Sequence, residues 1–463
     1  MPLSKSDKKV LELLTIQAND EREVKMQLNT NQLRRIKKHL EEKNNKKRSS
    51  ISQSRRQTSR VKLTAKDSIT IAGLRGTLGS NLLRIGDEIP ISSTRSKCFS
   101  YFCKNGIVDI SDNSKQNLQL CLLGSYVENF LKSTKYKHTT DCANDPNIRC
   151  LEKSFKNVRN KNTVMSAYMS VENYQCQNNE ERKVKKIYSH ILNQHAFRHH
   201  MFDPSLLVTY SEQSYIVKFW GYLFEEYFGI RSDIYLQWGD TTSKSCKEAG
   251  LGFRLDLRII AFTSSQNVDV LNGEVAKMTA ANEDKYYYDK RKAVLAAKNH
   301  LNHLVVNTKY LLPKDIHTIY MPIVQIMGMS CHLYVLSLID KGLYLLQRVY
   351  TMSYPQSNHE IRTGAIQKII RGFALIEDIL QNALDIYDEY SKDTQDIILK
   401  KIIKKKGCQK VDINDWISLV IEPEDYEEDR GNNEDEDEAE EAEEDEVEED
   451  EAEDDEASSE SQI

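Results

Sequence analysis

The chain has 463 residues, of which 39% are hydrophobic, 29% are charged and nine are cysteines, and its formal net charge is −6. This length is enough for two or three domains with a sizeable core. No apolar run is long enough to span a bilayer, the first residues lack the apolar segment of a secretory signal, and an odd number of irregularly spaced cysteines disfavours a disulfide framework. We therefore expect no membrane partner and a reducing compartment.

The charge is distributed unevenly along the chain. Between Glu422 and Glu460 there are 26 acidic residues and one arginine, a local charge of −25, so the rest of the chain carries +19. A basic body suits a polyanion such as DNA or RNA. We expect residues 421–463 to be a disordered tail, because like charges repel one another. Three roles are open for this tail: a solubilising segment, a mimic that competes for the basic groove, or a binder of basic proteins.

Residues 1–66 form a basic segment that has helical spacing in part. Two basic groups with a short spacer between them resemble a bipartite nuclear-import signal, and the same side chains can contact phosphates. Few core-forming residues accompany them, so the segment is predicted to be largely disordered or helical, and the protein to be nuclear. The residues expected to contact nucleic acid here are Arg34, Arg35, Lys37, Lys38, Lys46, Lys47 and Arg48.

Residues 67–205 give weaker signals, and we expect an accessory region beside the main domain. The run from Leu118 to Leu131 is typical of one buried helix, in which Gly124 carries a mild penalty. His195 and His199 stand four residues apart, as two metal ligands on a helix face would. The cysteines form no second closely spaced pair, so a zinc site is not favoured.

The main domain is predicted over residues 206–420. It begins with a helix from Ser211 to Phe228 that is apolar nearly all round and is therefore expected to be buried. A short strand, Ile234 to Trp238, comes next. The loop from Thr241 to Gly252 is predicted to be flexible, and its Lys244 and Lys247 are expected to touch a nucleic-acid backbone.

A hairpin follows that loop. Leu255, Leu257, Ile259 and Ala261 alternate with Arg254, Asp256, Arg258 and Ile260, which is the period of a strand, and a polar break leads to a return run rich in valine. Antiparallel pairing brings Asp256 and Glu274 close together near one end. Neighbouring carboxylates repel unless a cation or a proton lies between them, and Mg²⁺ binds one or two carboxylates together with substrate phosphates.

The elements after the hairpin complete the predicted domain. A helix is expected from Asp284 to Val306, three strands between Thr318 and Tyr354, and a long helix from His359 to Tyr390. The first of these strands is apolar throughout, as in a strand covered on both faces, but Pro322 cannot donate to a ladder, so that strand is expected to begin after it.

This order of helix, three strands, helix and strand, with an acid on the second strand and Glu then Lys on the third, resembles the PD-(D/E)XK nuclease superfamily over about residues 211–340. The resemblance implies a mixed α/β fold with a restriction-endonuclease-like core. It implies that Asp256 and Glu274 bind Mg²⁺ or Mn²⁺, and that a lysine positions or activates the attacking water. Glu212 matches the acid that this family often carries on its first helix.

The lysine departs from the family pattern, because Glu274 is followed by Val275, Ala276 and then Lys277. In a regular strand Lys277 points away from Glu274, so it serves only if the strand ends or bulges there. Lys290 is the other candidate, because it lies on the apolar stripe of the next helix. Lys292 falls nearly opposite that stripe and is predicted to be solvated.

Two function classes follow. The first is a metal-dependent nuclease whose catalytic residues are Asp256, Glu274, Glu212 and one of the two candidate lysines. The second is a nuclear nucleic-acid- or chromatin-binding protein that keeps the fold without turnover. A plainer interpretation of single residues stays open: Asp256 and Arg258 as surface charges, and Glu274 as a turn residue after Asn272-Gly273. Arg258 is otherwise expected to contact nucleic acid.

Overall fold

The computed structural model describes residues 64–112, 117–134, 136, 153, 155–263, 266–278, 283–308, 311–391 and 413–422. All of them belong to one compact unit that begins at Thr64. The basic residues predicted at the N-terminus and almost all of the acidic tail lie outside the described residues.

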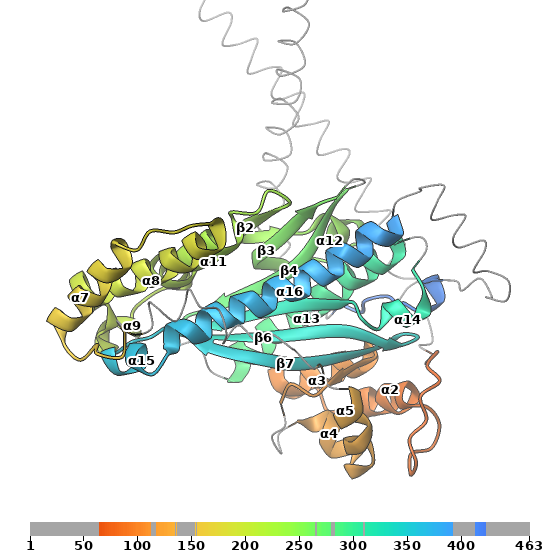
Figure 1. Cartoon of the computed structure of the whole chain (residues 1–463). Coiled ribbons are helices and arrows are strands. Elements are labelled where there is room, and N and C mark those ends of the chain that lie inside the picture. Colours follow the sequence, from red (N-terminus) through yellow and green to blue (C-terminus); the bar gives the residue numbers. More distant parts are fainter. Residues whose placement is uncertain are drawn as a thin grey trace, which may run out of the picture. The chain divides into compact units, whose positions relative to one another are not determined.

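A single mixed sheet of seven strands runs through this unit (Figure 1). The strands lie in the order β1-β7-β6-β5-β4-β3-β2, and only the contacts of β1 with β7 and of β4 with β5 are parallel. The mixed α/β class predicted from the sequence is confirmed. The strands are β1 (Ile107–Asp109), β2 (Ile234–Thr242), β3 (Arg254–Phe262), β4 (Asn267–Ala276), β5 (Tyr320–Met327), β6 (Ser330–Asp340) and β7 (Leu343–Ser353).

Helices cover both faces of this sheet. The longest are α13 (Glu283–Asn307) on one face and α16 (Ala365–Ser391) on the other; Figure 1 shows α16 crossing the front of the strands. The remaining helices are α2 (Leu78–Glu88), α3 (Thr94–Lys104), α4 (Leu118–Leu123), α5 (Glu128–Thr134), α7 (Lys161–Glu172), α8 (Asn179–Phe197), α9 (Pro204–Leu207), α10 (Glu212–Tyr215), α11 (Gly221–Phe228), α12 (Lys244–Glu248), α14 (Pro313–Ile316) and α15 (Asn358–Arg362). A π-helical turn, η4 (Ile216–Trp220), joins α10 to α11.

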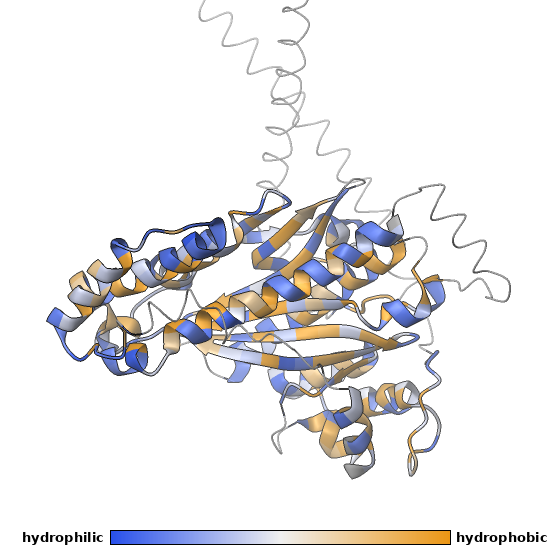
Figure 2. Cartoon of the chain, in the orientation of Figure 1, coloured by the Kyte–Doolittle hydropathy of each residue, from blue (hydrophilic) through white to orange (hydrophobic). Residues whose placement is uncertain are grey.

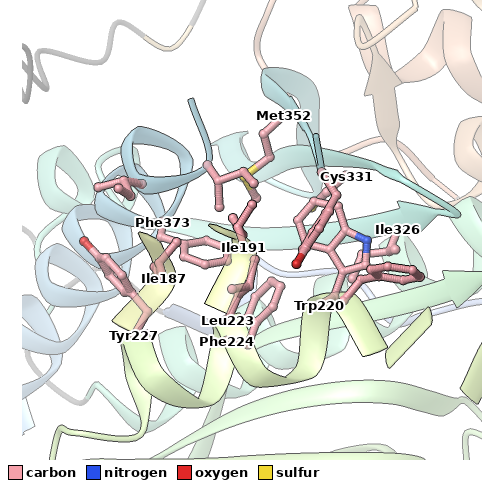
Figure 3. Packing of buried hydrophobic residues seen from close by; sticks show 14 of the residues in the cluster. Ile187, Ile191, Trp220, Leu223, Phe224, Tyr227, Ile326, Cys331, Met352 and Phe373 are labelled. Carbon is pink, nitrogen blue, oxygen red and sulfur yellow. The ribbon is translucent and has the colours of Figure 1, made fainter. Parts of the chain in front are cut away.

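The two faces of the sheet bury two hydrophobic cores. Val324 and Ile326 of β5 face the core built with α8, α11 and α16, whereas Met321 and Ile323 face the core built with α3 and α13. Figure 2 shows the strands coloured mainly as hydrophobic and the outer helices in both colours. In Figure 3 the labelled aromatic side chains of α11 pack among residues of α8 and α16. The predicted burial of the helix over residues 211–228 and of β5 on both faces is thereby confirmed.

Three sequence predictions need correction. The strand with Pro322 begins earlier, at Tyr320, but its ladder to β4 begins only at Ile323, so the missing N–H falls outside that pairing. The helix predicted over residues 118–131 breaks at Gly124, whose φ of 70° ends α4. The loop predicted to be flexible contains α12, which is capped by the buried Ser243.

Strand β3 lies between two irregular pairings. Its contact with β2 shifts register between Trp238 and Thr241, and its contact with β4 shifts between Ile259 and Ile260, where Val270 is an extra residue. Such bulges bend a strand and change which side chains share a face. The first shift lies opposite Asp256, and the second lies between Asp256 and the hairpin loop. Both are therefore close to the open end of the hairpin, where the candidate site lies.

Residues 413–422 pack along α13 as a strap. Ser418 and Leu419 offer their carbonyl oxygens to the side chains of Asn302 and Lys298, at 2.9 Å each. The carboxylate of Glu422 accepts a hydrogen bond of 2.8 Å from the backbone of Gly252. Glu422, the first acidic residue of the tail, therefore contacts the segment just before β3, four residues ahead of Asp256.

Candidate active site

The hairpin opens where its two carboxylates meet. Leu257 opposite Gly273 is the last pair of the ladder at this end, and Asp256 and Glu274 would form the next pair. Instead, the Asp256 carboxylate accepts a hydrogen bond of 2.7 Å from the backbone N–H of Val275. Directly opposite residues share a face of an antiparallel sheet, so both carboxylates point toward α13.

Glu274 is buried, with 1% of its surface exposed. Its Oε2 lies 2.8 Å from Nζ of Lys292, and beyond this ion pair neither oxygen has a hydrogen-bond donor among the described residues. Burial raises the pKa of Glu274 well above its ordinary value; Lys292 opposes this rise, while Asp256 and Asp289 add to it.

Helix α13 supplies the other charged groups. Lys285, Asp289 and Lys292 follow the spacing i, i+4, i+7 and so lie on one helix face. Nζ of Lys285 lies 3.1 Å from Asp289 and 3.6 Å from Glu212 at the start of α10. The side chain of Asp289 is fully buried, and beyond its ion pair with Lys285 neither oxygen has a hydrogen-bond donor in the described part of the chain. Burial raises the pKa of Asp289 to about 6.

Lys292 is not solvated as predicted, because only 13% of its side chain is exposed. The prediction considered one buried face of the helix, but α13 is covered by the sheet on one side and by α3 on the other. Burial opposes the charge on Lys292, yet the combined attraction of Glu274, Asp256 and Asp289 raises its pKa. The amine is therefore an ammonium ion at neutral pH.

The cluster as a whole is short of positive charge. Four carboxylates (Glu212, Asp256, Glu274 and Asp289) face two ammonium groups (Lys285 and Lys292), which leaves a formal excess of two negative charges. Burial raises the pKa of Asp256, with Lys292 only partly opposing it. Protons bound to these carboxylates, or a divalent cation, would supply the missing charge.

The donor set fits Mg²⁺ or Mn²⁺ held by Asp256 and Glu274. Among the described residues, no three His, Cys, Asp or Glu side chains are arranged to enclose a metal ion. Mg²⁺ does not need such a cage, because it usually keeps several waters and binds through one or two carboxylates plus substrate phosphates. Asp256 and Glu274 provide two opposed carboxylates of this kind, and Oε1 of Glu274 has no hydrogen-bond donor among the described residues.

The two lysines predicted for catalysis lie elsewhere. Lys290 is buried as expected, but its Nζ lies 2.6 Å from the carboxylate of Asp109 and 2.7 Å from the hydroxyl of Ser111. Lys277 follows the last residue of β4 and is exposed. Neither amine has Glu274 as its ion-pair partner, and Lys292 takes that place.

Of the described residues predicted to contact nucleic acid, two are exposed and one is buried. Lys244 and Lys247 are exposed on α12. Arg258 is only 6% exposed; its guanidinium lies 2.7 Å from the Asp269 carboxylate and also donates to Gln237. Arg258 of β3 thus joins β2 and β4 and has little surface for a nucleic acid. Arg34, Arg35, Lys37, Lys38, Lys46, Lys47 and Arg48 lie outside the described residues.

The histidines of α8 have structural surroundings. His195 is buried, stacks on Phe202 and has Nε2 3.0 Å from the carbonyl oxygen of Pro355. Burial lowers its pKa to about 4.

Sequence reasoning missed Lys285, Asp289 and Lys292 as site residues. Their signal was the i, i+4, i+7 spacing of three charges on a helix that directly follows the hairpin. That spacing becomes informative only when the helix is known to be buried on both sides, since the same pattern is common on solvated faces.

Comparisons place no known protein beside this geometry. No helix in the described part of the chain is long and apolar enough to cross a membrane. Searches of protein-family models, of curated proteins and of solved structures each found nothing that matches this chain.

Proposed function

We propose that this chain is a metal-dependent nuclease that hydrolyses phosphodiester bonds of DNA or RNA, built on a restriction-endonuclease-like core. One observation carries the proposal: Asp256 and Glu274 oppose each other at the open end of a strand pair, with the Lys292 amine 2.8 Å from Glu274. The convergence of two carboxylates and one lysine is what the resemblance to the PD-(D/E)XK superfamily requires.

The order of elements supports the proposed core. A helical segment (α10 to α11) precedes β2, β3 and β4; α13 follows, and β5 then pairs in parallel with β4. The sequence resemblance implies this succession of helix, three strands, helix and strand. In this arrangement the lysine comes from the helix rather than from the third strand.

The roles follow from the surroundings of each group. Asp256 and Glu274 would hold Mg²⁺ or Mn²⁺, which when bound neutralises the phosphate and activates water. Lys292 is protonated, so it donates hydrogen bonds and stabilises negative charge on the phosphate rather than accepting a proton. Glu212, whose side chain is 40% exposed, lies 3.6 Å from Lys285 at the solvent-facing side of the cluster.

The charge of the chain supports a polyanionic substrate. Outside the acidic segment the chain carries +19, and the basic N-terminal residues are typical both of phosphate contacts and of a nuclear-import signal. We therefore place the proposed activity on nucleic acid in the nucleus.

A non-catalytic nucleic-acid-binding protein is the second candidate. It is favoured by the ion pair between Lys292 and Glu274, because the lysine already occupies one oxygen of a carboxylate that a metal would use. This candidate predicts salt-sensitive binding of nucleic acid without cleavage.

The test is cleavage of labelled single- and double-stranded DNA and RNA with Mg²⁺, with Mn²⁺ and with EDTA. Asp256→Ala, Glu274→Ala and Lys292→Met should each reduce cleavage by about 100-fold or more, as expected for loss of a charged group that stabilises the transition state. Asp269→Asn is the matched control, since Asp269 forms a buried ion pair with Arg258 on the same hairpin. Its rate should stay within a few-fold of that of the parent chain.

Binding without cleavage under all metal conditions would contradict the nuclease and favour the second candidate. Cleavage that survives both Asp256→Ala and Glu274→Ala would show that the site is elsewhere.

A further inference from the structure

Lys285 occupies a position in the cluster that differs from that of Lys292. About 30% of its side chain is exposed, compared with 13% for Lys292, so it is the more accessible of the two ammonium groups. Its partners come from two helices: Asp289 one turn further along α13 and Glu212 at the start of α10. Lys285 therefore lies between the buried cluster and the solvent.

The helix itself does not favour a lysine at this place. Lys285 is the third residue of α13, where the partial positive charge of the helix N-terminus favours acids such as Glu283 and Asp284. The i, i+4 order with the lysine before the acid is also the less favourable one. A cation held in such a position indicates a role other than helix stability.

Asp289 fixes the ammonium group in that position. Its side chain has 0% accessible surface and faces only the other groups of the cluster. A buried carboxylate requires a nearby cation. Glu212 is different, because its side chain is 40% exposed and its carboxylate is 3.6 Å from Nζ. Exposed ion pairs at such distances are weak, so Lys285 can exchange Glu212 for another anion while it keeps Asp289.

We propose that Lys285 binds a non-bridging phosphate oxygen of the nucleic-acid substrate, with Asp289 as the positioning residue that holds it at the mouth of the site. The inference rests on the proposed nuclease function and adds a phosphate contact to it. Lys292 remains with Glu274, because leaving would uncover a buried carboxylate.

The experiment compares Lys285→Gln with Lys285→Arg and with the matched control Lys341→Gln. Lys341 is a lysine of similar exposure, 38%, with an ion pair of 3.0 Å to Asp415 at the turn between β6 and β7. Binding of a fluorescent oligonucleotide is measured in EDTA over a range of KCl concentrations, and KM and kcat are measured with Mg²⁺.

Loss of one phosphate contact should reduce the slope of log K against log salt by about 0.7 to 0.9 and raise KM roughly 10-fold in Lys285→Gln. Lys285→Arg should restore most of both, and Lys341→Gln should change neither. A purely structural role would not alter the salt slope. Lys285→Gln leaves the buried carboxylate of Asp289 without its ion-pair partner. A second variant, Lys285→Gln with Asp289→Asn, buries no unpaired carboxylate and should show the same salt slope.

An unchanged salt slope and KM in Lys285→Gln and in Lys285→Gln with Asp289→Asn, in a parent chain that cleaves its substrate, would overturn this inference and leave the nuclease intact. A parent chain that neither cleaves nor binds any of the oligonucleotides would overturn the proposed function and this inference with it.

Discussion

Lys290 and Lys292 are two residues apart on α13 and both are largely buried, but their surroundings differ. Lys290 has one carboxylate, Asp109, at 2.6 Å, the hydroxyl of Ser111 at 2.7 Å and the faces of three tyrosine rings. Lys292 lies among several acids whose charges exceed those of the nearby lysines. The first arrangement is balanced and joins β1 to α13, whereas the second is unbalanced. Burial alone therefore does not identify a functional lysine; an uncompensated charge around it does.

The largest effect should come from breaking the balanced pair. Lys290→Met leaves Asp109 buried without its cation, so we expect the free energy of unfolding to fall by about 3 to 5 kcal/mol. Chemical denaturation measures this loss, and Lys290→Met with Asp109→Leu should recover much of it. A loss no larger than that of an exposed lysine would contradict the view of Lys290 as a structural residue.

A smaller effect, of opposite sign, should follow when the unbalanced cluster loses a carboxylate. The pKa of Asp289 is raised from 3.8 to about 6, so the folded chain holds its proton more tightly than the unfolded chain does. The stability from this protonation is full below about pH 3.8 and is lost as the pH rises through about 6. At pH 7 Asp289→Asn should therefore increase the free energy of unfolding by about 1 to 2 kcal/mol.

The comparison over pH makes this prediction specific. The gain from Asp289→Asn should be near zero at pH 4 and should grow between pH 4 and pH 7, as followed by denaturant unfolding. Asp109→Asn serves as the contrast, because it removes the partner of Lys290 and should destabilise the chain at pH 7. A gain from Asp289→Asn that is the same at every pH would argue against the raised pKa.

The smallest effect should come from the metal ion. For a dissociation constant of about 1 mM, 10 mM Mg²⁺ adds about 1.4 kcal/mol to the free energy of unfolding. Glu274→Gln should abolish this increment, whereas Lys290→Arg should keep it. Thermal or denaturant unfolding with Mg²⁺ and with EDTA measures the difference, and an increment that survives Glu274→Gln would place the ion elsewhere.

Much of the fold could be predicted from local sequence patterns. Period-two alternation marked β3, the valine-rich return marked β4, and the apolar helix over residues 211–228 is buried as expected. These features depend on residues close together in the chain. The break at Gly124 and the helix within residues 244–248 were missed, because the prediction gave too little weight to two local signals, a glycine at positive φ and a serine N-cap.

The candidate site could be predicted only in part. Asp256 and Glu274 are opposed as the hairpin register requires, but the lysine could not be assigned, since α3 covers α13 from a segment almost 200 residues earlier. The same cause hid the pair of Lys290 with Asp109, which are 181 residues apart. A helical wheel drawn for α13 alone has no information about a second covering layer.

The extra residue Val270 in β4 changes which residue numbers of this strand share a face of the sheet, odd numbers before it and even numbers after it. Because of it, the odd-numbered Asp269 and the even-numbered Glu274 lie on the same face of the sheet as the even-numbered Arg258 and Asp256 of β3. One residue gained or lost in the loop after Phe262 leaves this parity intact. The same change between Asp269 and Glu274 would turn one carboxylate to the opposite core, so the hairpin can vary in length at its tip but not along this part of β4.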